Sequence, residues 1–298
     1  MRLRYAWVPA LAALGLTALP LAADTAPDAA PAGNKGPAVK WVKSPTTVSL
    51  GQEAKIKLAE GYVFADAADT RRLMAAMGNT VDNTEVGLVS PQTEGEDWIM
   101  VFEYHDVGYV KDDDKDKIDA DALLKNITEG TEQANKVRKE RGIPGLHVVG
   151  WEEKPNYDPV THNFQWALLA RNDDGSEVVN YNLRLLGRGG YMSVTLVEDP
   201  KKLAFSKPKM KAVLEGFAYN QGSRYAEWRS GDKIAEYGLA ALVAGGAGVA
   251  AAKFGLFALL AKLLAKAGKA IILLIVGIGA AIKRAWEKLT GRSSERVE

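Results

Sequence analysis

The sequence predicts an α+β fold, in which a mostly antiparallel sheet has helices packed on it, followed by a C-terminal transmembrane helix or helical hairpin. Apolar and polar residues alternate over residues 146–197, with turns between the runs, which is typical of antiparallel strands. Apolar residues recur at helical spacing over residues 67–77 and 119–141. Residues 237–282 are almost continuously apolar, which predicts the membrane segment.

The first 23 residues have the pattern of a secretory signal peptide. A short basic start precedes an apolar stretch that ends in small residues at Ala23. An uncleaved signal anchor is the alternative, but the apolar stretch is short and contains Pro9 and Pro20, so we expect cleavage after Ala23. Residues 24–43 are rich in Ala, Gly and Pro and predict a disordered linker.

Residues 44–233 are expected to form the exported α+β domain. Strands are expected over residues 46–50, 54–58, 86–89, 98–104, 146–151, 163–171, 177–186, 191–197 and 217–219. Helices are expected over residues 67–77, over 119–141 and from Ser206 to Gly216. Residues 98–104 are apolar on both faces, so this strand should lie in the middle of the sheet, and residues 152–162 should form a loop.

Composition excludes several kinds of chemistry. The chain has 38 basic and 37 acidic side chains, so its net charge of +1 gives no overall attraction to nucleic acid, and we expect no nucleic-acid partner. There is no cysteine, and therefore no disulfide or thiol nucleophile. His105, His147 and His162 lack the spacing of metal ligands, and no phosphate-binding or dinucleotide motif occurs. We expect no metal and no cofactor, and no catalytic residue is indicated.

Alternating carboxylates in residues 112–116 raise the hypothesis of a calcium loop. An EF-hand requires Gly at the sixth position and Glu at the twelfth, which are Lys117 and Leu123 here. We therefore prefer a solvated turn whose carboxylates favour the positive start of the following helix.

The candidate binding residues lie on one strand and beside it. Asn180, Asn182 and Arg184 share the polar face of the strand over 177–186, and Arg188 lies beyond them. Two interpretations remain open: a solvated sheet face, or a recognition surface with Tyr157 and Asp158 folded over it. The full candidate set is Tyr157, Asp158, Asn180, Asn182, Arg184 and Arg188.

Several short motifs carry a family resemblance. They are Gly61-Tyr62 with Phe64, Phe102-Glu103-Tyr104, the run Gly108 to Asp114, Gly150-Trp151 with Pro155, Tyr157 and Asp158, Trp166-Ala167, Asn180-Tyr181-Asn182, Leu186-Gly187-Arg188, and Ala235 with the run Tyr237 to Gly246. As a set over residues 44–253 they resemble an uncharacterised family of bacterial membrane-anchored proteins, a domain of unknown function. The resemblance implies an envelope domain held by a C-terminal anchor, with no known catalytic residues. The order of elements is also similar to the PsbP-like fold of small extracytoplasmic proteins.

The C-terminal region predicts a membrane anchor at residues 234–286 and a basic tail at 287–298. Residues 239–260 are long enough to cross a bilayer, which takes about 20 apolar residues. Residues 270–282 are more apolar but short for a span. Two topologies remain open. In the first, one span is followed by a basic segment on the cytoplasmic surface, and in the second, a hairpin returns the tail to the outside.

From these features we expect the protein to lie in the bacterial inner membrane, with its main domain in the periplasm or otherwise outside the cytoplasm. The leading hypothesis is an exported domain that binds or scaffolds, with the lipid bilayer as one partner and a membrane protein or a second copy as another. The first alternative is a carboxylate-dependent envelope hydrolase that uses Asp112 and Asp158, and the second is a structural subunit of a membrane complex.

Overall fold

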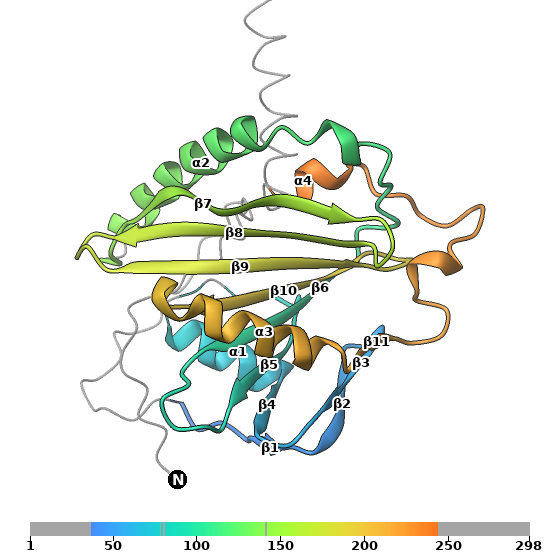
Figure 1. Cartoon of the computed structure of the whole chain (residues 1–298), viewed down its shortest axis with the longest axis horizontal. Helices are drawn as coiled ribbons and strands as arrows, with labels where there is room; N and C mark the ends of the chain where they lie inside the picture. The colour runs from blue at the N-terminus through green and yellow to red at the C-terminus, as the bar shows by residue number, and fades with distance from the viewer. Residues whose placement is uncertain (1–36, 78, 80, 141, 244–298) are drawn as a thin grey trace, which may run out of the picture. The chain divides into compact units, whose positions relative to one another are not determined.

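The computed structural model describes residues 37–77, 79, 81–140 and 142–243, which form two antiparallel sheets with helices packed on them (Figure 1). This confirms the predicted α+β class. The strands are β1 (Val42–Lys43), β2 (Thr46–Leu50), β3 (Ala54–Leu58), β4 (Tyr62–Asp66), β5 (Glu85–Pro91), β6 (Ile99–His105), β7 (Leu146–Asp158), β8 (Asn163–Asn172), β9 (Glu177–Leu186), β10 (Tyr191–Glu198) and β11 (Phe217–Tyr219). The α-helices are α1 (Ala67–Ala76), α2 (Ala120–Glu140), α3 (Leu203–Leu214) and α4 (Leu239–Val243), and the short 3-10 helices are η1 (Lys115–Lys117), η2 (Pro200–Lys202) and η3 (Tyr225–Glu227).

The larger sheet has eight strands in the order β1-β4-β5-β6-β10-β9-β8-β7, and every neighbouring pair is antiparallel. β6 lies in its interior, as its two apolar faces predict. β7 to β10 form the expected meander, and the turn from β8 to β9 contains Gly175 at a φ of 83°. The expectation of one sheet is incorrect, because β2, β3 and β11 form a separate three-stranded sheet.

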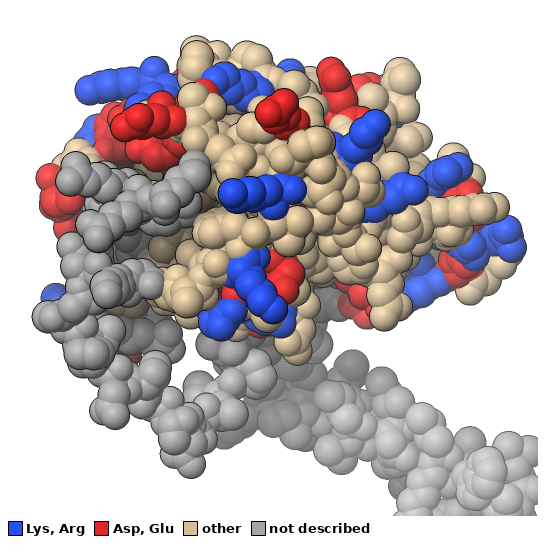
Figure 2. Space-filling model, turned by 90° about the horizontal axis from the view of Figure 1, so that it is seen from below, with Lys and Arg blue, Asp and Glu red and all other residues tan. Residues whose placement is uncertain are grey.

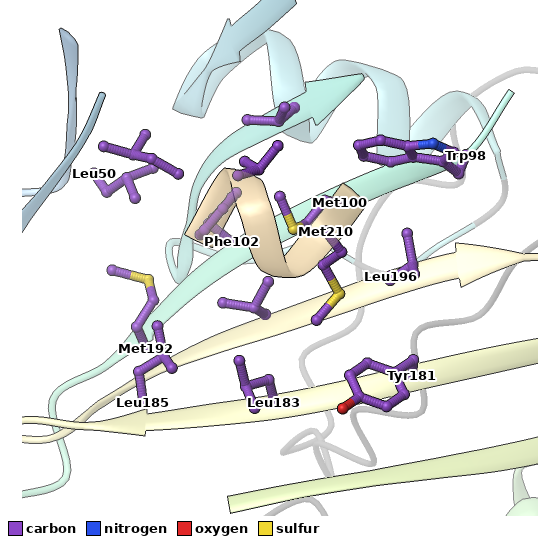
Figure 3. Close-up of a cluster of buried hydrophobic side chains, with 14 of the residues drawn as sticks. Leu50, Trp98, Met100, Phe102, Tyr181, Leu183, Leu185, Met192, Leu196 and Met210 are labelled. Atoms are coloured by element: carbon purple, nitrogen blue, oxygen red, sulfur yellow. The ribbon is translucent and has the colours of Figure 1, made fainter. Parts of the chain in front are cut away.

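The first face of the larger sheet packs against the small sheet and α3 to form the main core (Figure 3). Leu50 from β2, Phe102 from β6 and Met210 from α3 are all buried there. Tyr181 contributes from β9 with its aromatic ring fully buried. The apolar positions of the alternating strands supply this face, so the alternating pattern correctly identifies the core.

The second face is covered by different helices in different places. α1 packs over β4 and β5, where Met74 contacts the cluster that contains Leu88. α2 packs along β7 (Figure 1), and Leu123 and Ile127 join a cluster with Trp166 of β8. Leu239, Leu242 and Val243 of α4 belong to the same cluster. This face is therefore a second interior.

Three boundaries differ from the sequence prediction. Residues 152–158 continue β7 instead of forming a loop, because an edge strand tolerates Pro155. α3 begins at Leu203, since Asp199 accepts the N–H of Lys201 and starts η2 just before it. Ser206 therefore lies inside α3 and donates its hydroxyl to Glu198 instead of capping the helix. The folded domain also begins before residue 44, because β1 pairs with β4.

No helix within the described residues is long and apolar enough to cross a membrane. Of the expected span over residues 239–260, only Leu239–Val243 is described, as α4. The expected signal peptide (1–23), linker residues 24–36, the rest of the expected anchor (244–286) and the tail (287–298) lie outside the described residues.

Candidate functional site

A row of polar residues crosses the second face of the larger sheet. In the strand register, Arg184 of β9 lies opposite Ser193 of β10, and Ser193 lies opposite Glu103 of β6. Thr195 lies opposite Asn182 in the next row on the same face. We define the polar face as Glu103, Asn180, Asn182, Arg184, Ser193 and Thr195. The structure thus joins three of the predicted residues to three others from neighbouring strands.

The polar face is an interior surface. Asn180 is 3% exposed and Arg184 is 8% exposed, so the interpretation as a solvated sheet face is wrong. Aromatic residues flank the guanidinium, whose carbon lies 4.7 Å from the ring centre of Trp166 and 5.9 Å from that of Tyr191. Tyr191 belongs to a hydrophobic cluster against which Tyr237 packs, on the segment that leads into α4. The alternation of polar and apolar residues in β9 predicts that Asn180, Asn182 and Arg184 share one face. It does not predict the residues that bury this face.

Arg184 has few polar contacts for a buried cation. Its Nη1 donates to the carbonyl oxygen of Leu183 at 3.3 Å, and its Nε has no hydrogen-bond partner. No carboxylate of the described residues lies within 4.0 Å of the guanidinium nitrogens. Burial lowers the pKa of Arg184, and its interactions with Tyr191 and Glu103 oppose that change.

Glu103, in the polar face, and His105, beside it, are titratable side chains of β6. The Ser193 hydroxyl donates to Glu103 Oε2 at 3.1 Å, and burial raises the pKa of this carboxyl while Arg184 opposes the rise. The ring of His105 stacks on Tyr191 with centroids 4.7 Å apart. Burial lowers the pKa of His105 to about 4, so its imidazole is neutral at physiological pH.

The asparagines of β9 are partly bonded to each other and to β10. The Asn182 side-chain nitrogen donates to the Asn180 carbonyl oxygen at 3.0 Å, and Thr195 donates its hydroxyl to Asn182 Oδ1 at 3.3 Å. The side-chain oxygen of Asn180 is buried and has no partner. The polar face therefore contains an unpartnered acceptor and an unpartnered donor, Arg184 Nε, on one strand.

Tyr157 belongs to the same sheet row, whereas Asp158 does not extend the site. Tyr157 lies opposite Phe164, which lies opposite Arg184. The Tyr157 hydroxyl donates to Asp112 at 2.9 Å. It also lies 3.0 Å from Nδ1 of His162. The Asp158 carboxylate instead closes its own turn by accepting bonds from residues 160 and 161, which lower its pKa.

A shallow cavity of about 340 Å³ lies beside Tyr157. It is lined by Lys115, Asp116, Ile118, Pro155, Asn156, Tyr157 and Pro159. His162 has a φ of 55°, a conformation that non-glycine residues seldom adopt, and its ring centroid lies 4.2 Å from that of Tyr225. Tyr157, His162 and Tyr225 therefore form an aromatic corner of the domain, in which the backbone of His162 is strained.

Arg188 makes a separate contact. Its Nε and Nη2 each donate to Asp232 at 2.7 Å, which lowers the pKa of Asp232 to about 2 and raises that of Arg188. Both residues line a cavity of about 290 Å³ with Tyr104 and Gly189. Arg188 thus ties the turn after β9 to the segment before α4, and the structure does not group it with the polar face.

The carboxylates of residues 112–116 serve structural contacts. Asp114 accepts the backbone N–H groups of Leu239 and Ala240. Asp119 instead accepts the N–H groups of Asp121 and Ala122 at the start of α2. The interpretation that these carboxylates favour the start of the following helix is therefore wrong for Asp114, which binds the start of α4 instead. Within the part of the chain that is described, no three His, Cys, Asp or Glu side chains are placed to hold a metal ion.

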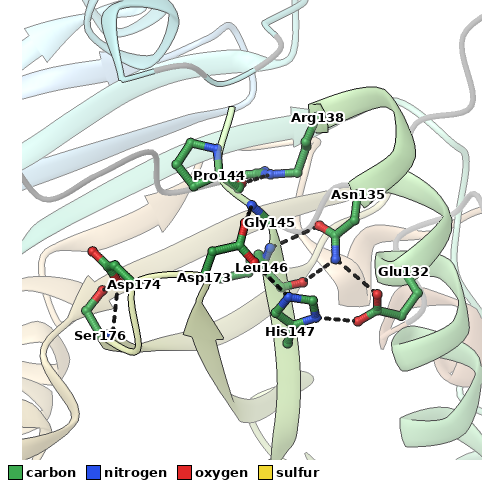
Figure 4. Close-up of polar contacts among 10 residues, drawn as sticks. All are labelled: Glu132, Asn135, Arg138, Pro144, Gly145, Leu146, His147, Asp173, Asp174 and Ser176. Carbon is green, nitrogen blue, oxygen red and sulfur yellow. Dashed lines mark hydrogen bonds and ion pairs between the residues drawn. The ribbon is translucent and has the colours of Figure 1, made fainter. Parts of the chain in front are cut away.

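A polar cluster that the sequence did not predict joins α2 to the first strand of the meander (Figure 4). His147 Nδ1 lies 2.8 Å from Glu132 of α2, and its Nε2 lies 3.0 Å from Asp173 in the turn after β8. Asn135 brackets Leu146 by bonds to both its N–H and its carbonyl oxygen. The partners are 15 and 26 residues from His147, so no local spacing indicates the contact.

The surface charge is mixed. Figure 2 shows Lys and Arg side chains lying among Asp and Glu side chains on the face drawn, so neither sign of charge covers that face.

The fold and the site define a two-sheet α+β domain with a buried polar face on its larger sheet. The chain belongs to the family described as "Protein of unknown function (DUF2167)", whose model matches residues 42–279. This confirms the predicted resemblance to a domain of unknown function. No curated protein matches the chain. Among solved structures, it is similar to the cyanobacterial PsbP (CyanoP) from Synechocystis sp. PCC 6803, with 12% identity over 63% of this chain and 96% of that chain and a TM-score of 0.36.

Proposed function

We propose that this chain is a bacterial inner-membrane protein whose exported domain binds a ligand or partner in the periplasm, close to the bilayer. The observation that carries the proposal is the position of the polar face beside the start of α4. Tyr237 packs against the hydrophobic cluster that contains Tyr191, the residue that flanks Arg184, and Leu239 of α4 is fully buried in that cluster. Buried polar residues without partners are costly to a fold, so their retention favours a binding role.

The membrane location rests on the two ends of the sequence. The basic and apolar start supports export, and the apolar run after residue 239 supports a C-terminal anchor in the lipid bilayer. In this proposal one span or a hairpin lies within residues 234–286, in the part that follows α4, and residues 44–233 remain outside the cytoplasm. The nearly balanced charge of the chain offers no reason to invoke nucleic acid.

Labelling of single cysteines tests this topology directly, because the natural chain has no cysteine and gives no background. Val160 is 85% exposed, so Val160→Cys reports on the domain. Ser293→Cys reports on the tail. A membrane-impermeant maleimide should label Val160→Cys in intact spheroplasts.

Labelling of Ser293→Cys only after lysis would indicate one span, and labelling before lysis a hairpin. A protected Val160→Cys, or a protein in the soluble cytosolic fraction that keeps its first residues, would contradict the proposal. Co-purification of one defined membrane complex after mild detergent extraction would instead favour a structural subunit.

A carboxylate-dependent hydrolase is the weaker proposal. Burial raises the pKa of Tyr157, and the carboxylates of Asp112 and Asp158 add to the rise, so both face the same phenol, which is the observation in favour of this proposal. Against it, Asp112 accepts the Tyr157 hydroxyl and Asp158 closes its own turn. A hydrolase of this kind should release soluble fragments from isolated cell envelopes, and Asp112→Asn should abolish the release.

A further inference from the structure

The guanidinium of Arg184 is the least satisfied charged group of the polar face. An arginine carries five N–H donors, and in the described residues only the Leu183 carbonyl oxygen accepts from this one. The side chain is 8% exposed and its Nε has no partner. A buried cation without an anion is strongly unfavourable, so the site lacks a counter-group.

The neighbouring carboxylate does not supply that counter-group. Glu103 lies two strands from Arg184 in the same row, with Ser193 between them. It accepts the Ser193 hydroxyl, and no ion pair within 4.0 Å joins it to Arg184 among the described residues. Tyr191 and Tyr237 carry no negative charge at neutral pH, because burial raises the pKa of both phenols. Burial lowers the pKa of His105, so its imidazole is neutral.

The aromatic rings hold the guanidinium in a fixed place. Its carbon lies 4.7 Å from the ring centre of Trp166 and 5.9 Å from that of Tyr191. A guanidinium whose flat faces lie against aromatic rings has its N–H donors at the edge of its plane. Through these donors it binds an oxyanion with two parallel hydrogen bonds.

We propose that the polar face binds an anionic ligand through a carboxylate or phosphate group held on Arg184, next to the segment that leads into α4. This inference deepens the proposed binding function and rests on it. It assigns the ligand class, an oxyanion, and the anchoring residue. Ser193 and Glu103 bound the site on the side of β6.

The test uses the full-length protein purified in a non-ionic detergent. Its thermal unfolding midpoint is measured against increasing inorganic phosphate and, separately, acetate, with sodium chloride matching the ionic strength. A ligand that binds only the folded state should raise the midpoint by about 3–6 °C for each tenfold increase above its Kd. A response to phosphate alone assigns the phosphate class, and a response to acetate alone assigns the carboxylate class.

Arg184→Met is the decisive variant. It removes the oxyanion fork and also the uncompensated charge, so the response should vanish while the midpoint without added anion stays equal or rises. Arg188→Met is the matched control: Arg188 is paired with Asp232, so its loss should lower the midpoint slightly and leave the response intact. Arg184→Lys keeps the positive charge but lacks the two parallel N–H donors of the guanidinium. It should need at least about tenfold more anion to reach the same rise of the midpoint.

Two results would overturn the proposal: a wild-type midpoint that follows ionic strength alone, or a full anion response in Arg184→Met. If Arg184→Met does not fold, an unchanged response in Arg184→Lys overturns it equally. Because this assay uses purified protein, its failure is separate from that of the cellular location, which the cysteine labelling tests.

Discussion

The carboxylate of Asp114 accepts the backbone N–H of Leu239 at 3.1 Å, across 125 residues of sequence. It also accepts the N–H of Ala240 at 3.3 Å. The first N–H groups of a helix have no partner within it, so Asp114 acts as a cap supplied from a distant loop. Gly238 leaves space for this carboxylate, since a side chain there would approach it to 2.5 Å. The loop of acidic residues thus fixes the start of α4 on the domain.

Asp114→Ala should therefore destabilise the domain by about 1 kcal/mol, the usual effect of losing a helix cap. The midpoint of urea unfolding measures it. Asp114→Asn should retain most of the stability, because the amide oxygen still accepts a hydrogen bond. Asp116→Ala is the control, since the Asp116 carboxylate is 89% exposed and makes only a weak contact with Lys115. Equal stabilities of Asp114→Ala and Asp116→Ala would show that the cap contributes nothing.

The cluster around His147 predicts a pH dependence of stability. Hydrogen bonds to Glu132 and Asp173 raise the pKa of His147 above its ordinary value of 6.5. Below pH 6.5 the imidazolium contributes its full stabilisation to the fold. This stabilisation is lost as the pH rises through the raised pKa of His147. The pKa values of Glu132 and Asp173 are lowered, so their contribution is present above their ordinary values of 4.5 and 3.8 and lost on acidification.

Urea midpoints measured between about pH 5 and about pH 9 should show this loss in the wild type. His147→Gln should flatten the dependence. His147 and Glu132 are both about half exposed, so we expect less than about 1 kcal/mol from their pair. Asp174→Asn serves as the control, because Asp174 bonds to Ser176 and not to His147. A His147→Gln profile that declines with pH as steeply as the wild type would contradict the assignment.

The sequence predicts most strands and helices because local patterns determine them. The alternation of β9 and the apolar spacing of α2 are each visible within one segment. For residues 152–158 the sequence predicts a loop, because charged residues and Pro155 suppress the strand signal. Only the position of these residues at the sheet edge permits a strand. That position is a property of the whole sheet.

The candidate site was predictable only in part for the same reason. Asn180, Asn182 and Arg184 share a face by the two-residue period of β9. Their neighbours Ser193 and Glu103 are 90 residues apart and meet only through strand order. The burial of the face depends on Trp166, Tyr191 and other groups from separate elements, which no local pattern reports.

Gly190 is predicted to be essential for the end of the β9–β10 hairpin. A Cβ atom at this position would collide with the backbone carbonyl oxygen of His105, which cannot move without shifting β6. Gly190→Ala should therefore destabilise the domain by about 1–3 kcal/mol, as overpacking usually does. Gly150→Ala is the matched control, because a Cβ there meets no atom within 4 Å and its φ is not positive. It should leave stability unchanged or raise it slightly. Equal urea midpoints for the two variants would contradict this prediction.

The Tyr157 hydroxyl is predicted to stabilise the aromatic corner through Asp112. It donates to the Asp112 carboxylate at 2.9 Å, and burial together with this bond raises the pKa of Tyr157, so the phenol stays protonated at physiological pH. Tyr157→Phe should destabilise the domain by about 1 kcal/mol, since partial exposure weakens a bond to a charged acceptor. Tyr62→Phe is the control, because its ring packs on Trp98 and its hydroxyl makes no hydrogen bond in the described residues.

A double-mutant cycle separates this bond from other effects of the substitution. If the hydroxyl acts through Asp112, the variant that combines Tyr157→Phe with Asp112→Asn should be more stable than the sum of the two single losses predicts. Additive losses would show that the hydroxyl acts through another group, such as His162, whose Nδ1 lies 3.0 Å away. Because Tyr157 and Arg184 share one sheet row, the anion response of Tyr157→Phe should also be measured. We expect it unchanged, since Phe164 lies between the two residues and the Tyr157 hydroxyl contacts Asp112 rather than the polar face.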